Sequence, residues 1–420
     1  MRHPAHSNPL GINGLGRIGK LTVWHHVARR SFPHLVVNLG RQAGRSLEAV
    51  CDVIQNDSTY GDMDRFLFGV SAPPSVRIVD RDRRLLEVAG TPVTVLQDAR
   101  NPAEVAWHEN GVRVVVDTTG AFDDPSLPEN APGGSLRGHL AAGVEKVVYS
   151  AAFKRSRDVD AMPDDCVTII HGVNHDAYDP SRHHLVSAAS CTTTALAHMV
   201  KPLLESIGAS TIMTASMSTV HAATNSQAVL DNVPSEGAKD LRRNRSVLNS
   251  MVLTSTSAAR ALEEVLPEIR EIGFMADSVR VPLPTGSLII LNMTFQTRLD
   301  EAGRPIVDRE VLNGRFRSAA EGSQRGLLVF SEAQNVTRDI IGVRAAVVIE
   351  GVETHTRTGF VEVDIASLPG VPPAVRTQLG DGGIRVPVTH AKVFGWYDNE
   401  YGSYTNMLGE VTDHVASALI

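Results

Sequence analysis

The sequence predicts an α/β fold whose first half forms a parallel sheet, followed by an α+β half with an antiparallel sheet. Two patterns predict this division. Between Leu10 and about Ser190, continuous Val/Ile runs alternate with helical stretches, as expected of strands that are buried on both faces. Beyond the helix that follows Cys191, runs such as Ser210–Thr224 and Ser287–Leu299 alternate polar and apolar residues, as half-exposed antiparallel strands do.

The length of the chain favours two domains. A chain of 420 residues exceeds what one compact core usually supports. We expect the first domain to comprise residues 1–190 together with 398–420, and the second to comprise residues 191–397. Helical segments of the first half include Gly16–Arg30 and Pro125–Gly143.

Composition restricts the partners and the compartment. A formal charge of −7 gives no electrostatic reason to expect nucleic acid or an anionic membrane as partner. The sequence lacks a run long enough to span a bilayer and a signal-peptide pattern, so we expect a cytoplasmic protein. Three widely spaced cysteines favour free thiols over disulfides or a zinc site, and the histidines and carboxylates show no metal-ligand spacing.

The first chemical signal is the stretch GINGLGRIGKL. It places Gly14, Gly16 and Gly19 after a short strand and before a helix. Glycines at this spacing allow a tight turn and a close approach of the backbone to a pyrophosphate at the positive end of the helix. The first half is therefore predicted to be a Rossmann-type, NAD(P)-binding domain.

The second strand leaves the choice between NAD and NADP open. The acidic residue that usually holds the ribose 2′-hydroxyl is replaced by Leu39, and Arg41 and Arg45 follow closely. A missing carboxylate with nearby arginines permits a 2′-phosphate. Arg41 and Arg45 are equally well interpreted as ordinary loop charges.

A single cysteine provides the second signal. In SAASCTTTALAHM, an apolar helical rhythm begins directly after Cys191, so the thiol lies at a helix N-terminus, where the dipole favours thiolate. A nucleophile of this kind needs a base, and the best candidate among the histidines is His221, at a strand end beside Thr224.

These stretches together resemble a known family. SAASCTT, STVHAATN, RVPLP and WYDNE, with GINGLGRIG at the start, closely resemble the glyceraldehyde-3-phosphate dehydrogenases in wording and in order. The resemblance implies that Cys191 attacks a phosphorylated aldehyde, that His221 activates the thiol, and that inorganic phosphate cleaves the resulting thioester after hydride transfer to NAD or NADP. It also implies a homotetramer that acts in glycolysis or gluconeogenesis.

The resemblance also assigns binding residues by motif match. Six residues would contact the substrate phosphate or the attacking phosphate: Ser190, Thr192, Thr224, Thr256, Ser257 and Arg280. Ten would contact the dinucleotide: Gly14, Gly16, Arg17, Ile18, Gly19, Arg41, Arg100, Thr119, Ser150 and Asn399.

The chain departs from the family pattern at several positions. Ser257 replaces a glycine of the phosphate site, and Ser403 with Tyr404 reverses the usual Tyr-Ser order. Thr194 replaces an asparagine, and additions lie near Asp123–Gly134 and Val352–Val388.

Two alternative functions remain open from the sequence. One is the same thiol chemistry on another phosphorylated aldehyde, such as erythrose 4-phosphate, ending in hydrolysis; Ser257 is the relevant clue. The other is a non-catalytic relative that binds a dinucleotide and acts through partners.

Overall fold

A computed structural model of the chain describes residues 5–154, 161–364, 369–379 and 384–419. Residues 1–4, 155–160 and 420 of the predicted first domain lie outside the described residues. So do residues 365–368 and 380–383, which belong to the second predicted addition.

The first half forms the predicted sheet, which has nine strands within the described residues. Seven strands are parallel, and β5 and β6 extend the edge at β7 in antiparallel pairs. In spatial order the strands are β10 (Cys166–Thr168), β11 (Leu185–Ser187), β9 (Lys146–Tyr149), β8 (Val114–Asp117), β1 (Leu10–Asn13), β2 (Leu35–Asn38), β7 (Thr91–Leu96), β6 (Leu85–Val88) and β5 (Val76–Asp80).

The continuous apolar runs are strands covered on both faces, as the sequence predicts. All four residues of β1, β2, β8 and β9 are buried. One core contains Leu10 and Ile12 with α1, and a second core on the other face contains Val115 and Trp107. Because β1 and β8 are adjacent, the carboxyl ends of the central strands meet at one edge of the sheet, where ligands of such sheets bind.

The second half forms a mixed sheet of eight strands within the described part of the chain. Its long pairs β12–β15 and β15–β19 are antiparallel, as expected, while β12–β14 and β16–β17 are parallel. Alternation has the same period in both arrangements, so it could not distinguish them. The strands are β13 (Val252–Thr254), β14 (Gly273–Val281), β12 (Ile212–Ala222), β15 (Ser287–Gln296), β19 (Ile384–Tyr397), β17 (Val347–Glu350), β16 (Leu328–Ser331) and β18 (His355–Val363).

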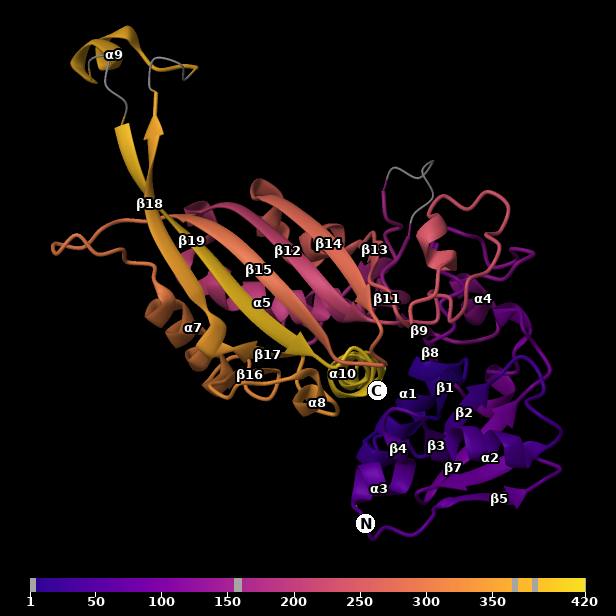
Figure 1. Ribbon diagram of the computed structural model, residues 1–420. Coiled ribbons are helices and arrows are strands. Elements are labelled where there is room, and N and C mark those ends of the chain that lie inside the picture. The colour runs from indigo at the N-terminus through magenta and orange to yellow at the C-terminus, as the bar shows by residue number, and fades with distance from the viewer. Residues whose placement is uncertain (1–4, 155–160, 365–368, 380–383, 420) are drawn as a thin grey trace.

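Helices cover one face of the second sheet. Leu196, Met199, Val200 and Leu203 of α5 pack against Met217 and other inward side chains of the strands. This helix runs beneath the sheet in Figure 1. The helices are α1 (Arg17–Arg29), α2 (Leu47–Gln55), α3 (Met63–Phe68), α4 (Leu136–Ala141), α5 (Cys191–Ile207), α6 (Ala258–Val265), α7 (Arg309–Glu321), α8 (Thr337–Ile340), α9 (Pro373–Leu379) and α10 (Asn406–Ser417). A two-stranded ribbon pairs β3 (Asn56–Asp57) with β4 (Gly61–Asp62).

One helix is shorter than the sequence predicts, and the C-terminal helix lies beside the sheet to which residues 398–420 were expected to belong. The helix expected over Pro125–Gly143 is confined to Leu136–Ala141, because Pro132, Gly133 and Gly134 precede it and do not favour helix. The C-terminal helix α10 packs Leu408 and its neighbours into the core of the first sheet, although it follows the second sheet in the chain.

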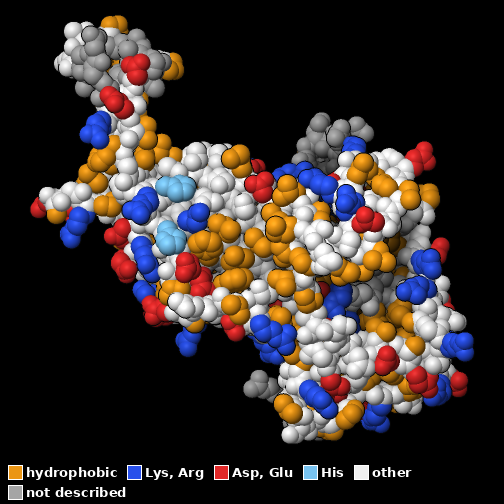
Figure 2. All heavy atoms as spheres, viewed as in Figure 1, with side chains coloured by type: hydrophobic (Ala, Val, Ile, Leu, Met, Phe, Trp, Pro, Cys, Tyr) orange, Lys and Arg blue, Asp and Glu red, His pale blue; other side chains and the backbone are white. Residues whose placement is uncertain are grey.

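The second predicted addition forms a projecting ribbon. The strands β18 and β19 pair in antiparallel register and extend from the body, with α9 at the tip (Figure 1). Apolar side chains line its stem in Figure 2, and Phe360, Val361 and Ile384 are exposed. No helix of the described residues is long and apolar enough to cross a membrane.

Candidate active site

Cys191 is the first residue of α5, at the junction of the two sheets. The preceding Ser190 caps this helix, since its hydroxyl accepts a 3.1 Å hydrogen bond from the Thr193 N–H. Ser190, predicted to bind phosphate, therefore also fixes the start of α5. Thr194, a departure from the family pattern, is buried in the same first turn.

His221 faces the thiol from β12. Its Nε2 lies 3.4 Å from Cys191 Sγ, and its Nδ1 lies 2.7 Å from the carbonyl oxygen of Ala222. The carbonyl only accepts, so this contact requires a proton on Nδ1, which would leave a lone pair on Nε2 toward the thiol. The Arg280 guanidinium, which only donates, also contacts Nδ1 and requires the opposite tautomer. The two predicted catalytic residues are thus within reach of a proton transfer, although 30 residues separate them in sequence.

Arg280 approaches the same histidine from β14. His221 and Arg280 are directly paired in the parallel register of β12 and β14. The Arg280 guanidinium contacts His221 Nδ1 and lies 3.3 Å from the Ala222 carbonyl oxygen through Nη1. Its Nε is buried and has no hydrogen-bond partner within the described chain. A half-buried guanidinium with a buried, unpaired Nε–H suits an anion such as phosphate.

Burial and Arg280 both keep His221 uncharged. Burial is the larger cause and the positive charge of Arg280 the second, and together they lower the pKa of His221 from 6.5 to about 3. A neutral imidazole with a free Nε2 lone pair can accept a proton at neutral pH.

Burial opposes the thiolate that is expected at the helix start. Burial raises the pKa of the Cys191 thiol, although Arg280 and the N–H groups of the first helical turn oppose this effect. The cost of desolvating a thiolate outweighs the helix N-terminus here. The resting pair is therefore a thiol beside a neutral imidazole.

A tyrosine joins the two predicted catalytic elements. The Tyr397 hydroxyl lies 2.9 Å from Thr192 Oγ1 and 2.8 Å from Thr219 Oγ1, and its ring centroid is 6.0 Å from that of His221. Thr192, which is predicted to bind phosphate, is buried, and its hydroxyl is hydrogen-bonded to Tyr397. Tyr397 belongs to WYDNE, so the sequence contained the signal, but only Asn399 of that stretch was singled out.

Tyr404 fixes the backbone just before the thiol. Its hydroxyl donates to the carbonyl oxygen of Ala189 at 3.0 Å, while the neighbouring Ser403 donates to Ala346. Tyr404 is buried, and this burial is the main cause that raises the pKa of its hydroxyl well above the ordinary value. The reversed Ser-Tyr order thus places the tyrosine ring against the loop that precedes Cys191.

The other predicted phosphate residues lie on loops near β12 and β13. Thr224 is exposed and its hydroxyl contacts Gln227 at 2.9 Å. Thr256 Oγ1 accepts a hydrogen bond from the Ala258 N–H. Ser257 has a φ of −94°, so the serine that replaces glycine occupies an ordinary backbone conformation.

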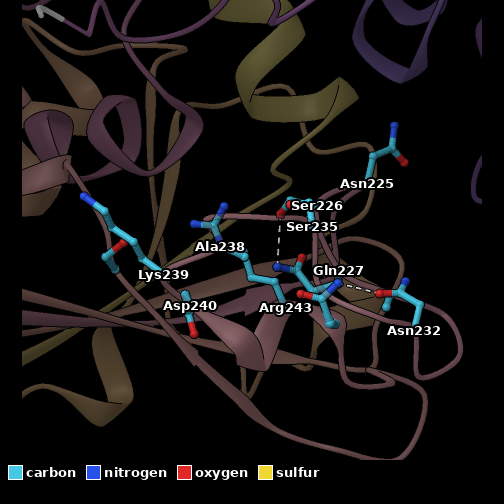
Figure 3. Close-up of a pocket in the computed structure, with 12 residues that line it drawn as sticks. Asn225, Ser226, Gln227, Asn232, Ser235, Ala238, Lys239, Asp240 and Arg243 are labelled. Carbon is cyan, nitrogen blue, oxygen red and sulfur yellow. Dashed lines mark hydrogen bonds between the residues drawn. The ribbon is translucent and has the colours of Figure 1, made fainter.

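A polar pocket adjoins these loops. It has a volume of about 590 Å³ and two cationic lining side chains, Lys239 and Arg243. Figure 3 shows both with Gln227, the partner of Thr224. Burial is the main cause that lowers the pKa of Arg280, and the positive charge of Arg243 adds a smaller lowering effect, so this lining residue of the pocket is near the thiol site. The pocket can therefore hold the charged end of an anionic substrate.

The glycine turn fits a dinucleotide. Gly14 has a φ of +98°, and a Cβ on Gly19 would lie 2.1 Å from the Gly14 carbonyl oxygen. A Cβ on Gly16 would meet no heavy atom within 4 Å among the described residues. Gly14 and Gly19 are thus needed by the turn itself, whereas the space over Gly16 is open to a ligand.

Arg17 follows this turn but its guanidinium is occupied. It contacts Asp57 and Glu400, with Nε 2.9 Å from Glu400 Oε1. Its predicted dinucleotide contact is thus left to its backbone N–H at the start of α1. Ile18, the next predicted contact, is half-buried beside it.

The remaining predicted contacts lie at the carboxyl edge of the first sheet. Arg100 donates to the Gly40 carbonyl oxygen at 3.2 Å, and Arg41 is exposed. Thr119 is exposed, with its hydroxyl donating to Asp117, and the Ser150 N–H donates to the Asp117 carbonyl oxygen.

Asn399 has a fixed amide orientation. Its Oδ1 accepts hydrogen bonds from Thr285 Oγ1, the Gly286 N–H and Ser287 Oγ, at 2.9 to 3.2 Å. These three donors assign Oδ1 and leave the Nδ2 hydrogens for another acceptor. A carboxamide oxygen of a bound nicotinamide would fit this requirement. Groups that could hold a metal ion, meaning three or more His, Cys, Asp or Glu side chains together, do not occur among the described residues.

A dinucleotide-binding sheet, a cysteine–histidine pair and an arginine beside the histidine define a class of cofactor-dependent thiol dehydrogenases. The comparisons with known proteins specify the family. The family model described as "Glyceraldehyde 3-phosphate dehydrogenase, NAD binding domain" matches residues 9–125, and the one for the C-terminal domain matches residues 190–365. The chain belongs to the glyceraldehyde-3-phosphate dehydrogenase family.

Individual relatives match over almost the whole chain. A glyceraldehyde-3-phosphate dehydrogenase of Streptomyces coelicolor is 32% identical over 98% of this chain and 99% of its own length. The protein of that name from Geobacillus stearothermophilus is 33% identical over 97% of this chain and 98% of its own length. Glyceraldehyde-3-phosphate dehydrogenase 1 of Bacillus subtilis is 31% identical over 97% of this chain.

Proposed function

We propose that this chain is an NAD(P)-dependent glyceraldehyde-3-phosphate dehydrogenase of the phosphorylating type. The observation that supports this most directly is the 3.4 Å approach of Cys191 Sγ to His221 Nε2 beside the guanidinium of Arg280. The full-length match to dehydrogenases of that name supports the same reaction.

In the first step, Cys191 Sγ forms a bond to the aldehyde carbon while its proton passes to His221 Nε2. The oxygen of the resulting thiohemiacetal can accept hydrogen bonds from the protonated His221 ring and from the Cys191 N–H, which lies at the start of α5. These donors stabilise the charge that develops on this oxygen.

In the second step, the thiohemiacetal becomes a thioester. His221 gives the proton it took from Cys191 to the thiohemiacetal oxygen, and accepts this hydroxyl proton back as the carbon–hydrogen bond breaks. A bound nicotinamide would supply the hydride acceptor. Inorganic phosphate then attacks the thioester carbon, the carbon–sulfur bond breaks, and an acyl phosphate leaves with Cys191 regenerated.

The anionic groups have two candidate positions. One is the pocket lined by Gln227 and Arg243, with Thr224 hydrogen-bonded to Gln227. Ser190, Thr192, Thr256 and Ser257 lie at the starts of α5 and α6 and would contact the attacking phosphate. We propose that Arg280 neutralises the phosphate charge between the two groups.

The dinucleotide would lie on the glycine turn. The open space over Gly16 would admit the pyrophosphate, with Gly14, Gly19 and the backbone of Arg17 and Ile18 around it. Asn399 Nδ2 would donate to the carboxamide, and Arg41, Arg100, Thr119 and Ser150 would line the remaining path along the sheet edge.

We further propose the predicted boundaries, with residues 1–190 and 398–420 forming the dinucleotide domain and 191–397 the catalytic domain. The packing of α10 with the first sheet supports this division. A cytoplasmic homotetramer is the proposed assembly. Leu253 and Met275, which are 57% and 71% exposed on β13 and β14, support a subunit interface there, and three free cysteines support a reducing compartment.

A steady-state assay tests the proposed function. Purified protein is mixed with glyceraldehyde 3-phosphate and NAD+ or NADP+, with and without inorganic phosphate, and reduced cofactor is followed by absorbance. We expect turnover that depends on phosphate and exceeds the turnover with erythrose 4-phosphate. Phosphate-independent turnover would instead support a hydrolysing dehydrogenase, and no reduction of either cofactor would contradict the proposal.

A further inference from the structure

A basic pocket lies beside the end of β2, where the ribose of a dinucleotide would bind. It has a volume of about 260 Å³ and is lined by Arg45, Arg81 and Arg84, among others. Gln97, which follows β7, also lines it, and the Leu39 N–H donates to the Leu96 carbonyl oxygen beside it. The pocket is therefore located at the carboxyl edge of the adjacent strands β2 and β7.

Leu39, at the position expected to contact the ribose, has no side-chain hydrogen-bond acceptor for a hydroxyl. Leu39 is half-buried and packs against the core of the first sheet. A leucine side chain cannot accept the hydrogen bond that a carboxylate would accept from a ribose 2′-hydroxyl, and it does not repel an anion.

The charges around the pocket favour an anion. Arg81 contacts Glu48, and Arg84 Nη1 lies 2.7 Å from Asp98 Oδ2, so both nearby carboxylates are engaged. Arg45 has no carboxylate partner among the residues that the structure describes. Three guanidinium groups against two carboxylates leave the pocket with excess positive charge.

The N-terminus of helix α2 adds to the positive electrostatic potential of the pocket. Ser46 and Leu47 line the pocket, and α2 begins at Leu47. Its first N–H groups and the positive end of its dipole are therefore directed toward the pocket, an arrangement that suits a phosphate.

We propose that this pocket binds the 2′-phosphate of NADP, so that the enzyme prefers NADP to NAD. The inference rests on the proposed function, because it needs a dinucleotide in the predicted orientation. The class of ligand is a phosphate monoester on an adenosine ribose, and Arg45 and Arg84 are the residues that distinguish the two cofactors.

Binding of adenosine nucleotides tests the pocket without any turnover. The full chain is titrated by calorimetry with 2′,5′-ADP, with ADP and with inorganic phosphate. We expect 2′,5′-ADP to bind at least about tenfold more tightly than ADP, since one charge-assisted hydrogen bond contributes about 1.5–3 kcal/mol. Inorganic phosphate should compete only weakly, because it lacks the adenosine.

Substitutions assign the effect to the pocket. Arg45→Ala and Arg84→Ala should reduce the preference for 2′,5′-ADP several-fold, and Leu39→Asp should reverse it. Arg83→Ala is the matched control, because Arg83 lies on the same turn, is 84% exposed and pairs with Asp80 at 3.7 Å. Arg45→Ala breaks no ion pair among the described residues. A changed preference for 2′,5′-ADP in this variant is therefore not explained by a rearranged loop.

The outcomes separate the inference from the proposed function. Equal affinity for ADP and 2′,5′-ADP, or a preference that survives both arginine substitutions, would overturn the NADP assignment. If NAD+ is nevertheless reduced with glyceraldehyde 3-phosphate, the proposed function stands. Failure to bind or reduce either dinucleotide would overturn both. Tight binding of inorganic phosphate alone would show a free-anion site and also overturn the assignment.

Discussion

The hydroxyl of Tyr404 donates a 3.0 Å hydrogen bond to the carbonyl oxygen of Ala189, two residues before Cys191. Ala189 is buried and has a φ of +55°, in the left-handed region that costs a residue other than glycine about 1–2 kcal/mol. Its N–H donates to Ser187 Oγ at 3.0 Å. Hydrogen bonds therefore fix both the N–H and the carbonyl group of this strained residue, and they orient the start of α5, where Cys191 lies.

Removing the Tyr404 hydroxyl should misplace the thiol. For Tyr404→Phe we expect kcat to fall by about tenfold, with little change in KM, because one buried hydrogen bond contributes about 0.5–1.5 kcal/mol. Ala189→Gly in the same chain should restore part of kcat, since glycine adopts a positive φ without strain. Steady-state kinetics of both variants measure this.

Tyr178→Phe is the matched control for that experiment. The Tyr178 hydroxyl is buried but has no hydrogen-bond partner within the described residues, so its removal breaks no bond. An unchanged kcat for Tyr404→Phe, or an equal loss for Tyr178→Phe, would show that the hydroxyl does not position Cys191.

Two glycines of the turn are expected to serve different purposes: Gly19 is needed for packing, and Gly16 for binding the dinucleotide. Gly19→Ala should lower the free energy of unfolding by about 3 kcal/mol or more, because its Cβ would lie 2.1 Å from the Gly14 carbonyl oxygen. Gly16→Ala should leave stability within about 0.5 kcal/mol but weaken dinucleotide binding. Chemical denaturation and calorimetric titration measure the two quantities. Unchanged dinucleotide affinity in Gly16→Ala would contradict the pyrophosphate position.

The reactivity of Cys191 should report its pKa. Burial raises the pKa of this thiol above its ordinary value of 9.0, so alkylation by iodoacetamide should be slow at neutral pH and accelerate in the alkaline range. Arg280 favours the thiolate, so Arg280→Gln should move the midpoint to still higher pH, whereas the exposed Arg260→Gln should not. The background is Cys51→Ser, because Cys51 is only half-buried. A midpoint below pH 7 without ligand would refute this charge assignment.

Buried histidines should make the fold sensitive to acid. Burial is the main cause that lowers the pKa of His26, His171 and His198 to about 4 and that of His25 well below 6.5. Because the folded-state pKa values lie below the unfolded value, this contribution to stability is complete above about pH 6.5 and is lost as the pH falls toward 4. The free energy of unfolding should therefore decrease through this window.

A single substitution tests that account. Both ring nitrogens of His26 are buried without a hydrogen-bond partner in the described chain, so His26→Leu should recover up to about 3 kcal/mol of the acid loss. The exposed His108→Leu is the control. Denaturant titrations at pH 7, 5.5 and 4.5 give the comparison, and parallel pH curves for His26→Leu and the unmodified chain would refute it.

Elements whose residues follow a regular hydrophobic pattern were predicted from the sequence. The apolar runs within Val112–Gly120 and Glu145–Ala152 predicted buried parallel strands, and the periodicity after Cys191 predicted α5. The strands Val76–Asp80 and Leu85–Val88 were not recognised, since these short edge strands alternate with many charged residues. The parallel pair β12–β14 also has no local signature.

The site shows the same limit. Cys191 and His221 were predicted as a pair, and the structure places them in contact, while their roles stay proposals. Tyr404 was noted only as a reversed dipeptide, because its partner Ala189 lies 215 positions away and a hydrogen bond between distant residues has no spacing rule. The helix-start argument for a thiolate at Cys191 leaves out the opposing effect of burial, because a sequence does not show how deeply a group is desolvated.

The central claim is that Cys191 forms the covalent intermediate, and a single-turnover experiment with mass spectrometry tests it most directly. The protein is mixed with glyceraldehyde 3-phosphate and NADP+ or NAD+ in the absence of inorganic phosphate. We expect one equivalent of reduced cofactor per chain and an acyl adduct on the peptide that contains Cys191, released when phosphate is added. A burst with the adduct on another residue, or continuous turnover without phosphate, would contradict the account.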